Sequence, residues 1–90
     1  EFYKAIDNCN EVISRDTENV KALYRRGKCY FETWDLDLAE ADLKRAAKLS
    51  PSLAAMVQTD LATLAEKKRN REMADRRLLA GKMSLQSSNG

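Results

Sequence analysis

Residues 20–31 read VKALYRRGKCYF, and this stretch decides how the rest of the chain is interpreted. Three of its apolar or small residues, Leu23, Gly27 and Tyr30, recur at the spacing of one helical face. A glycine inside a helix costs about 1 kcal/mol relative to alanine, so a compensating interaction is needed. We therefore expect an antiparallel helix to pack closely here, with Gly27 and Ala39 at the crossing.

A related helical pattern lies upstream, displaced by 34 residues. Each copy is one face of a helix followed by an exit turn. The positions that correspond are Ala5, Cys9, Val12 and Thr17 in the first copy and Ala39, Leu43, Ala46 and Pro51 in the second. Self-similarity at this period is typical of stacked helix pairs, so the pattern predicts an all-α, antiparallel helix-pair solenoid fragment.

The pattern also sets the expected boundaries. Residues 1–19 should form the second helix of a truncated repeat and its turn, and residues 20–53 a complete repeat with helices at 20–33 and 36–49. Because repeats stack on one another, a chain beginning inside a repeat is expected to be a piece of a longer protein.

The remaining sequence should form a long capping helix over residues 54–81. Ser50 and Pro51 suit the N-cap and first helical position, and Gly81 is the expected end. An apolar stripe should cover the neighbouring helix: Leu53, Met56, Val57, Leu61, Leu64 and Ala65. From Glu66 onward the helix is polar on nearly every face and should project, followed by a disordered tail at residues 82–90.

The repeat resembles a known family. Leu23, Gly27, Tyr30, Ala39, Leu43, Ala46 and Pro51 resemble the tetratricopeptide repeat signature, which implies the helix-pair fold. Arg26 and Thr17 depart from that signature, which prefers leucine and proline there. The segments KALYRRG and ADLKRAAKLSP look most like the immunophilin group, in which a peptidyl-prolyl isomerase domain precedes three repeats. Trp34 and the long last helix resemble its aryl-hydrocarbon-receptor-interacting branch, although Trp34 can simply fill the turn.

Composition excludes several classes of function. Hydrophobic residues make up 43% and charged residues 33% of the 90 residues, and the net charge is +2. The positive surplus lies after residue 65, and it is too small for a dedicated nucleic-acid binder. There is no apolar run long enough for a membrane span and no signal peptide, so we expect a cytoplasmic protein, which could also be nuclear.

The chain lacks the residues that catalysis and metal binding usually need. It contains no histidine, no glycine-rich phosphate loop and no nucleophile paired with a base, so we expect no enzyme, no metal and no cofactor. Cys9 and Cys29 should be buried, reduced thiols. Acids cluster where they favour the helix dipole: Asp35, Asp37, Glu40 and Asp42. If an isomerase domain exists in the parent, it lies outside these residues.

A row of cations is the candidate binding feature. Lys21, Arg25 and Lys28 share one helical stripe, with Tyr24 and Phe31 beside it as a possible additional groove together with Lys28. Fixed cations next to aromatic side chains suit an extended acidic peptide. The alternative is a solvated helix face on which Lys28 merely pairs with Glu32, four residues later.

The resemblance makes the binding hypothesis specific. In co-chaperones with these repeats, a lysine and an arginine four residues apart belong to a carboxylate clamp, which holds the C-terminal Glu-Glu-Val-Asp of heat-shock proteins 90 and 70. Lys21 and Arg25 match those two positions. The other clamp residues lie on helices upstream of this chain, so the chain should bind such a peptide weakly. A helical scaffold for assembly, with no clamp, is the competing interpretation.

Three roles remain open for the last helix. It could be solvated without a partner, it could hold a client or receptor as the resembling branch implies, or its basic segment could bind calmodulin. The scatter of Lys67, Lys68, Arg69, Arg71, Arg76 and Arg77 around the helix weakens any single-groove interpretation. The first helix, which lacks its partner, could also mediate self-association.

Overall fold

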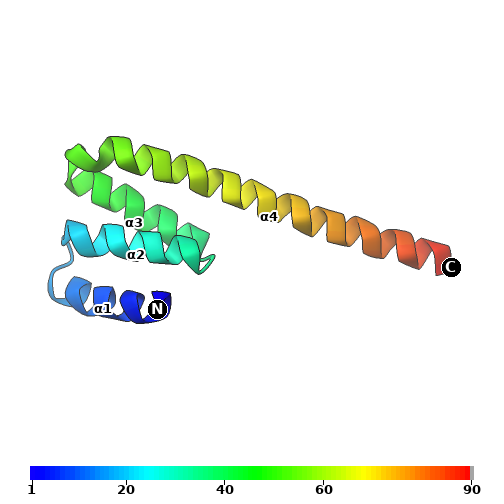
Figure 1. Cartoon of the computed structure of the whole chain (residues 1–90), viewed down its shortest axis with the longest axis horizontal. Coiled ribbons are helices and arrows are strands. Elements are labelled where there is room, and N and C mark those ends of the chain that lie inside the picture. Colours follow the sequence, from blue (N-terminus) through cyan, green and yellow to red (C-terminus); the bar gives the residue numbers. More distant parts are fainter. Residues whose placement is uncertain (90) are drawn as a thin grey trace.

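The computed structural model consists of helices joined by short turns (Figure 1). It describes the backbone of residues 1–89 and the side chains of residues 1–80. The elements are α1 (Phe2–Arg15), α2 (Val20–Glu32), α3 (Leu36–Leu49), the 3₁₀ helix η1 (Pro51–Leu53) and α4 (Ala54–Asn89). The all-α class expected from the periodicity is thereby confirmed, with no strand among the described residues.

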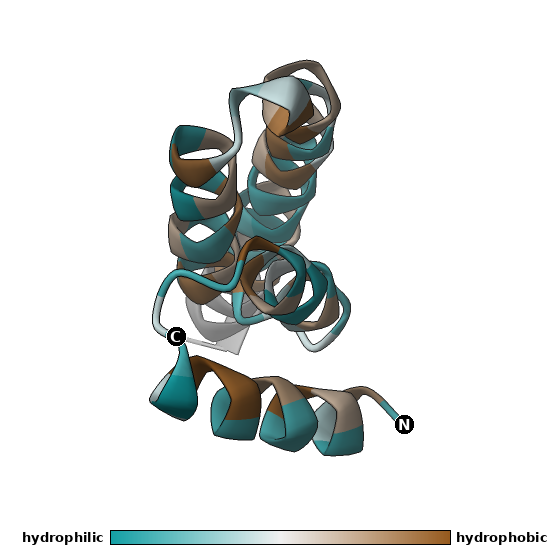
Figure 2. Ribbon diagram, turned by 90° about the vertical axis from the view of Figure 1, so that its left-hand side faces the viewer, coloured by the Kyte–Doolittle hydropathy of each residue, from teal (hydrophilic) through white to brown (hydrophobic). Residues whose placement is uncertain are grey.

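The helices pack in chain order, α1 against α2, α2 against α3 and α3 against α4. Figure 2 shows α1 with its hydrophobic side turned toward the other helices and its hydrophilic side turned away. The side chains that α1 buries are Ile6 and Cys9. α4 starts beside α3 and then runs far beyond the body of the molecule (Figure 1). None of the described helices combines the length and apolarity that crossing a membrane requires.

Local capping fixes where α2 begins and ends. The Asn19 side chain accepts a hydrogen bond from the amide of Ala22 at 2.9 Å, which satisfies one of the unpaired donors at the helix start. At the other end Trp34 has a φ of 65°, and the amide of Asp35 donates to the carbonyl of Tyr30 at 2.9 Å. This is the reversal that usually carries glycine, so Trp34 occupies a strained position.

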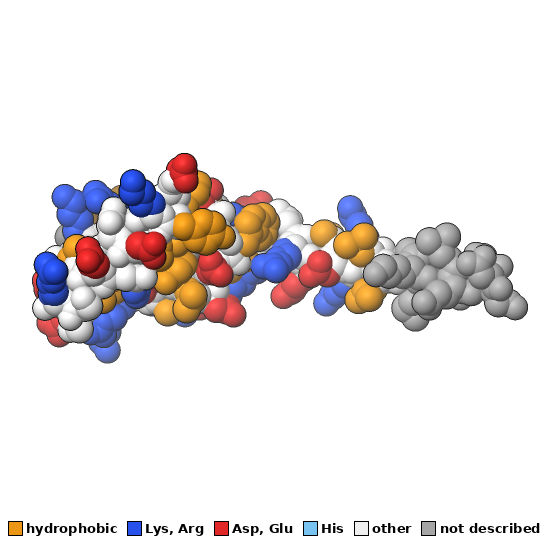
Figure 3. Space-filling model, turned by 90° about the horizontal axis from the view of Figure 1, so that it is seen from below, with side chains coloured by type: hydrophobic (Ala, Val, Ile, Leu, Met, Phe, Trp, Pro, Cys, Tyr) orange, Lys and Arg blue, Asp and Glu red, His pale blue; other side chains and the backbone are white. Residues whose placement is uncertain are grey.

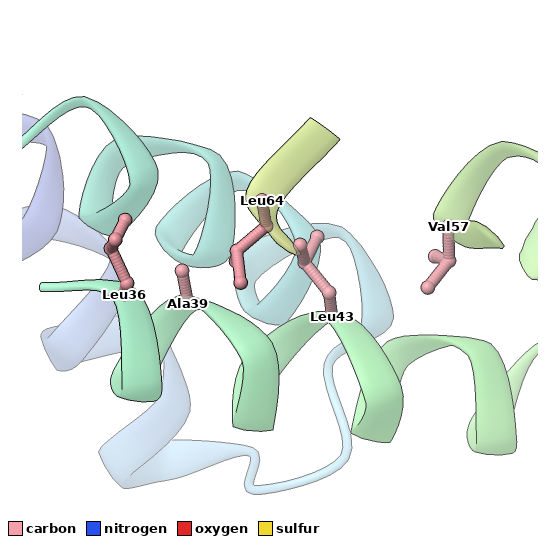
Figure 4. Packing of buried hydrophobic residues seen from close by; sticks show 5 residues of the cluster. All are labelled: Leu36, Ala39, Leu43, Val57 and Leu64. Carbon is pink, nitrogen blue, oxygen red and sulfur yellow. The ribbon is translucent and has the colours of Figure 1, made fainter. Parts of the chain in front are cut away.

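The hydrophobic core is formed by α3 and α4, and partly buried aromatic side chains of α2 pack against it. Its buried members are Leu36, Ala39, Leu43, Val57 and Leu64. Figure 4 shows Leu64 of α4 pointing toward Ala39 and Leu43 of α3. The expected apolar stripe is confirmed at the buried Val57 and Leu64 and at the partly buried Leu53 and Leu61, whereas Met56 and Ala65 are exposed. Those two residues point away because α4 packs against the rest of the molecule along one face only, and the expected stripe is wider than that face.

Close packing at Gly27 is confirmed, but its partner differs from the expected one. A Cβ atom at Gly27 would lie 3.1 Å from Cγ and Cδ2 of Leu43 and 3.2 Å from Cβ of Asp42. Ala39 is fully buried, yet it is not among these nearest neighbours. The side chain of Leu43, about one helical turn after Ala39, fills the space above the glycine.

The end of the last helix also differs from the expectation. α4 passes Gly81 without interruption and reaches Asn89, so the helix end at Gly81 is wrong for this structure. A single glycine lowers helix propensity by only about 1 kcal/mol, and good helix formers precede it. Residues 82–89, expected to be disordered, continue the helical backbone, and residue 90 lies outside the described residues.

Candidate functional site

Lys21 and Arg25 lie side by side on the exposed face of α2, one helical turn apart. Each is in contact with two hollows of the surface. Among the side chains described, residues 1–80, neither residue belongs to an ion pair. Two exposed cations that have no ion-pair partner among these described side chains remain available to bind carboxylates.

The first hollow, of about 350 Å³, lies between α1 and α2. Asn8, Cys9 and Val12 of α1 line it opposite Lys21 and Arg25. It therefore combines an amide, an apolar wall and two cations. Burial, followed by the neighbouring Cys29, raises the pKa of the Cys9 thiol above its ordinary value, which disfavours the thiolate.

The second hollow, of about 500 Å³, lies on the other side of the same two cations. Val20 and Tyr24 of α2 face Ser50 and Leu53 across it. An apolar side chain placed here would lie next to the charges of Lys21 and Arg25. This hollow was not foreseen, because Ser50 and Leu53 are distant in sequence and come to α2 only through the fold.

The additional groove expected from Tyr24, Lys28 and Phe31 is divided in the structure: Lys28 and Phe31 line a small hollow of about 120 Å³ together with Asp60, whereas Tyr24 lines the second hollow. The Tyr24 hydroxyl donates to Asp60 Oδ2 at 2.7 Å and Lys28 Nζ donates to Asp60 Oδ1 at 2.9 Å. Lys28 thus pairs with Asp60 of α4 rather than with Glu32. The three groove residues are engaged by α4, which sequence spacing cannot reveal because Asp60 lies 32 residues beyond Lys28.

Asp60 also perturbs the phenol that it binds. Burial, the hydrogen bond to Asp60 and the negative charge of that carboxylate together raise the pKa of Tyr24 to about 12. Tyr24 therefore keeps its proton throughout the neutral pH range, and its hydroxyl donates a hydrogen bond to Asp60. The ring is held as a fixed wall of the second hollow.

Phe31 is covered by a cation from α4. Lys67 Nζ lies 4.0 Å from the centre of the Phe31 ring and 4.1 Å from that of Trp34, and it donates to the Phe31 carbonyl at 2.7 Å. Arg71 reaches the Trp34 carbonyl at 3.4 Å. The projecting helix therefore stays attached to the body as far as Arg71, one turn beyond Glu66, where its apolar stripe was expected to stop.

Lys68 completes this attachment. Together with Lys67 and Arg71 it forms what we call the cation cluster. Lys68 Nζ binds Asp37 at 2.8 Å and Glu40 at 3.0 Å. Hydrogen bonds from Lys44 and Lys68 lower the pKa of Glu40. Asp37 and Glu40, two of the acids interpreted from sequence as favouring the helix dipole, thus also bind a cation directly.

The described residues contain no group of three His, Cys, Asp or Glu side chains placed to hold a metal ion. What the site offers is a pair of cations between two partly apolar hollows. Stacked helix pairs form extended surfaces of this kind.

Comparison with known proteins places this geometry in a family. The tetratricopeptide repeat profile matches residues 20–53, so this segment is a tetratricopeptide repeat, a module for protein–protein interaction. The chain as a whole is related to immunophilins of the FK506-binding type.

Three relatives show how far the similarity extends. Peptidyl-prolyl cis-trans isomerase FKBP4 of Mus musculus is 35% identical over 79 residues, which cover 88% of this chain and 17% of that protein. Peptidyl-prolyl cis-trans isomerase FKBP42 of Arabidopsis thaliana is 37% identical over 68 residues, covering 76% and 18%. Aryl-hydrocarbon-interacting protein-like 1 of Bos taurus is 32% identical over 75 residues, covering 80% and 23%. The chain spans less than a quarter of the length of each.

Proposed function

We propose that this chain forms one side of a peptide-binding surface in a co-chaperone, and that Lys21 and Arg25 hold the carboxylates of an acidic chain terminus. The peptide is the C-terminal Glu-Glu-Val-Asp of heat-shock protein 90 or 70. The observation that carries the proposal is the pair of exposed, unpaired cations between two hollows on α2. Each charge-assisted hydrogen bond contributes about 1.5–3 kcal/mol.

The second hollow supports a peptide of mixed character. Carboxylates at Lys21 and Arg25 place the intervening aliphatic side chain near Val20, Leu53 and the ring of Tyr24. Lys28 takes no part, because Asp60 neutralises it. The basic stripe is thereby shortened from three residues to two, which suits a short acidic terminus better than a long acidic tract.

The wider protein is part of the same proposal. The relatives named as peptidyl-prolyl isomerases support an isomerase-like domain upstream of this segment, with the described residues acting only in binding. We place the protein in the cytoplasm, with access to the nucleus. The projecting part of α4 is a further surface for a client or receptor.

The competing function is a helical scaffold for assembly. The specific observation in its favour is the exposed side of α1, where Phe2, Tyr3 and Val12 face solvent. In that case the cations of α2 only keep the surface hydrated. The two functions differ in whether Lys21 and Arg25 matter for binding an acidic terminus.

A titration separates them. A peptide ending in Glu-Glu-Val-Asp is added to the 90-residue chain, and binding is followed by calorimetry. Lys21→Ala and Arg25→Ala should each weaken binding by about 1–3 kcal/mol, and added salt should weaken the native interaction. Arg45→Ala is the matched control, since it removes an exposed cation from α3. A peptide amidated at its C-terminus should bind less well. Equal affinities for all variants would exclude the clamp.

A further inference from the structure

A shallow hollow of about 580 Å³ lies between the start of α3 and the part of α4 that follows Lys68. It is separate from Lys21 and Arg25, which do not line it. Two large apolar side chains in its wall remain exposed, Trp34 at 47% and Leu38 at 52%. Apolar side chains of this size at the rim of a hollow offer a docking surface.

Four acids and two cations, Lys68 and Arg71, line this hollow, so its net charge is negative. Asp37 is neutralised by Lys68, and Asp35 accepts a hydrogen bond from the Thr33 hydroxyl at 2.6 Å. Glu72 and Asp75 of α4 also line the hollow, and neither is in an ion pair with any side chain of residues 1–80. The missing partner should therefore bring a cation next to apolar side chains.

The chain itself carries such a segment. Leu78 and Leu79 follow Asp75 by three and four residues, so they lie on the hollow-facing side of α4. They are 66% and 61% exposed. Arg76 follows Glu72 by four residues and flanks the same side, whereas Arg77 points in the opposite direction.

The projecting helix has no support of its own. Every described residue from 72 to 80 is exposed, and the helix leads away from the hollow (Figure 1). Figure 3, seen from below, shows apolar side chains gathered on the body and both signs of charge along the projecting part. Short isolated helical segments are marginal in water, so packing against a neighbour would stabilise this one. The segment cannot reach the hollow of its own chain.

We propose that this side of α4 docks on the same side of a second copy of the chain, with the two helices antiparallel. Leu78 and Leu79 of each copy cover Trp34 and Leu38 of the other, and Arg76 lies beside Glu72 of the partner subunit. The contact is self-complementary, as a two-fold interface must be. A second copy is favoured over an unrelated partner because this chain supplies both the acidic hollow and the basic, apolar segment that fits it.

Sedimentation equilibrium of the 90-residue chain tests the proposal. The native chain should show a concentration-dependent monomer–dimer equilibrium. Glu72→Lys places a lysine opposite Arg76, and Arg76→Glu places a glutamate opposite Glu72, so each variant alone should raise the dimer dissociation constant about tenfold or more. An equimolar mixture of the two variants should dimerise again, because the mixed dimer has an opposite-charge pair at both positions.

The mixture distinguishes a contact between chains from an effect on helix stability. Within each variant chain, residues 72 and 76 carry charges of the same sign, so only a contact between the two chains can restore an opposite-charge pair. Arg77→Glu is the matched control with the same change of charge, and it should leave the equilibrium unchanged. Tyr3→Ser tests association through α1 instead. A native chain that remains monomeric, a mixture that fails to dimerise, or a Tyr3→Ser variant that alone abolishes the dimer overturns the proposal.

Discussion

Arg26 of α2 binds Asp42 of α3 through two hydrogen bonds, Nε to Oδ2 at 2.7 Å and Nη2 to Oδ1 at 2.8 Å. Its remaining nitrogen, Nη1, donates to Asn10 of α1 at 2.9 Å. One guanidinium therefore joins three helices at a position where the repeat signature prefers leucine. Asp42 is buried, and the hydrogen bond to it is the main reason that the pKa of Arg26 is raised.

Removing one member of this pair should destabilise the fold strongly. Asp42→Ala leaves a partly buried guanidinium without its partner, and we expect a loss of about 3 kcal/mol in the free energy of unfolding. Urea denaturation followed by circular dichroism measures it. Asp37→Ala is the control, because its pair with Lys68 is exposed and should contribute under about 1 kcal/mol. Equal effects of the two variants would contradict the assigned role of Asp42.

Gly27→Ala should destabilise the chain although alanine is the better helix former. The added methyl group would lie 3.1 Å from the buried side chain of Leu43, which would have to shift to make room for it. Overpacking of this kind costs about 1–3 kcal/mol, against a propensity gain of about 1 kcal/mol. Thermal unfolding measures the difference. In a chain that already carries Leu43→Ala, Gly27→Ala should be neutral or stabilising. If Gly27→Ala destabilises that chain as much as it destabilises the native chain, the contact is refuted.

Stability at high pH should depend on Tyr24. Its pKa rises from 10.0 to about 12 on folding, so the neutral phenol is the form that folding favours. The stabilisation is complete below pH 10 and is lost as the pH rises through about 12. Unfolding free energies measured across this window should fall more steeply for the native chain than for Tyr24→Phe. Parallel pH profiles would show that the hydrogen bond to Asp60 does not form.

The cation cluster should hold the middle of α4 against the ends of α2 and α3. Lys67→Met retains much of the aliphatic chain but removes the charge between the rings of Phe31 and Trp34, which we expect to cost about 1–2 kcal/mol. The chain has one tryptophan, so its fluorescence reports this contact directly. Arg69→Met, on an exposed position of the same helix, is the control. The same emission spectrum for native chain and Lys67→Met would contradict the contact.

Local pattern was sufficient for the helices. Val20 and Leu36 begin α2 and α3 where the sequence placed them, because a 3.6-residue apolar period and short polar turns leave few alternatives. The end at Gly81 was predicted less well, since one glycine is a weak signal against a long run of helix formers. Register across a helix pair needs more than the period, since the side chain nearest to Gly27 is that of Leu43.

The sequence by itself determined that the chain is a helical repeat and that Lys21, Arg25 and Lys28 share one side of a helix. Only the tertiary structure decided which of these cations remain available. Asp60 arrives from α4 to bind Lys28 and Tyr24, while Lys21 and Arg25 keep their charges unpaired within the described side chains. The reason is physical: helical periodicity fixes direction around one axis, but the pairing of charges depends on distances between helices that only packing sets.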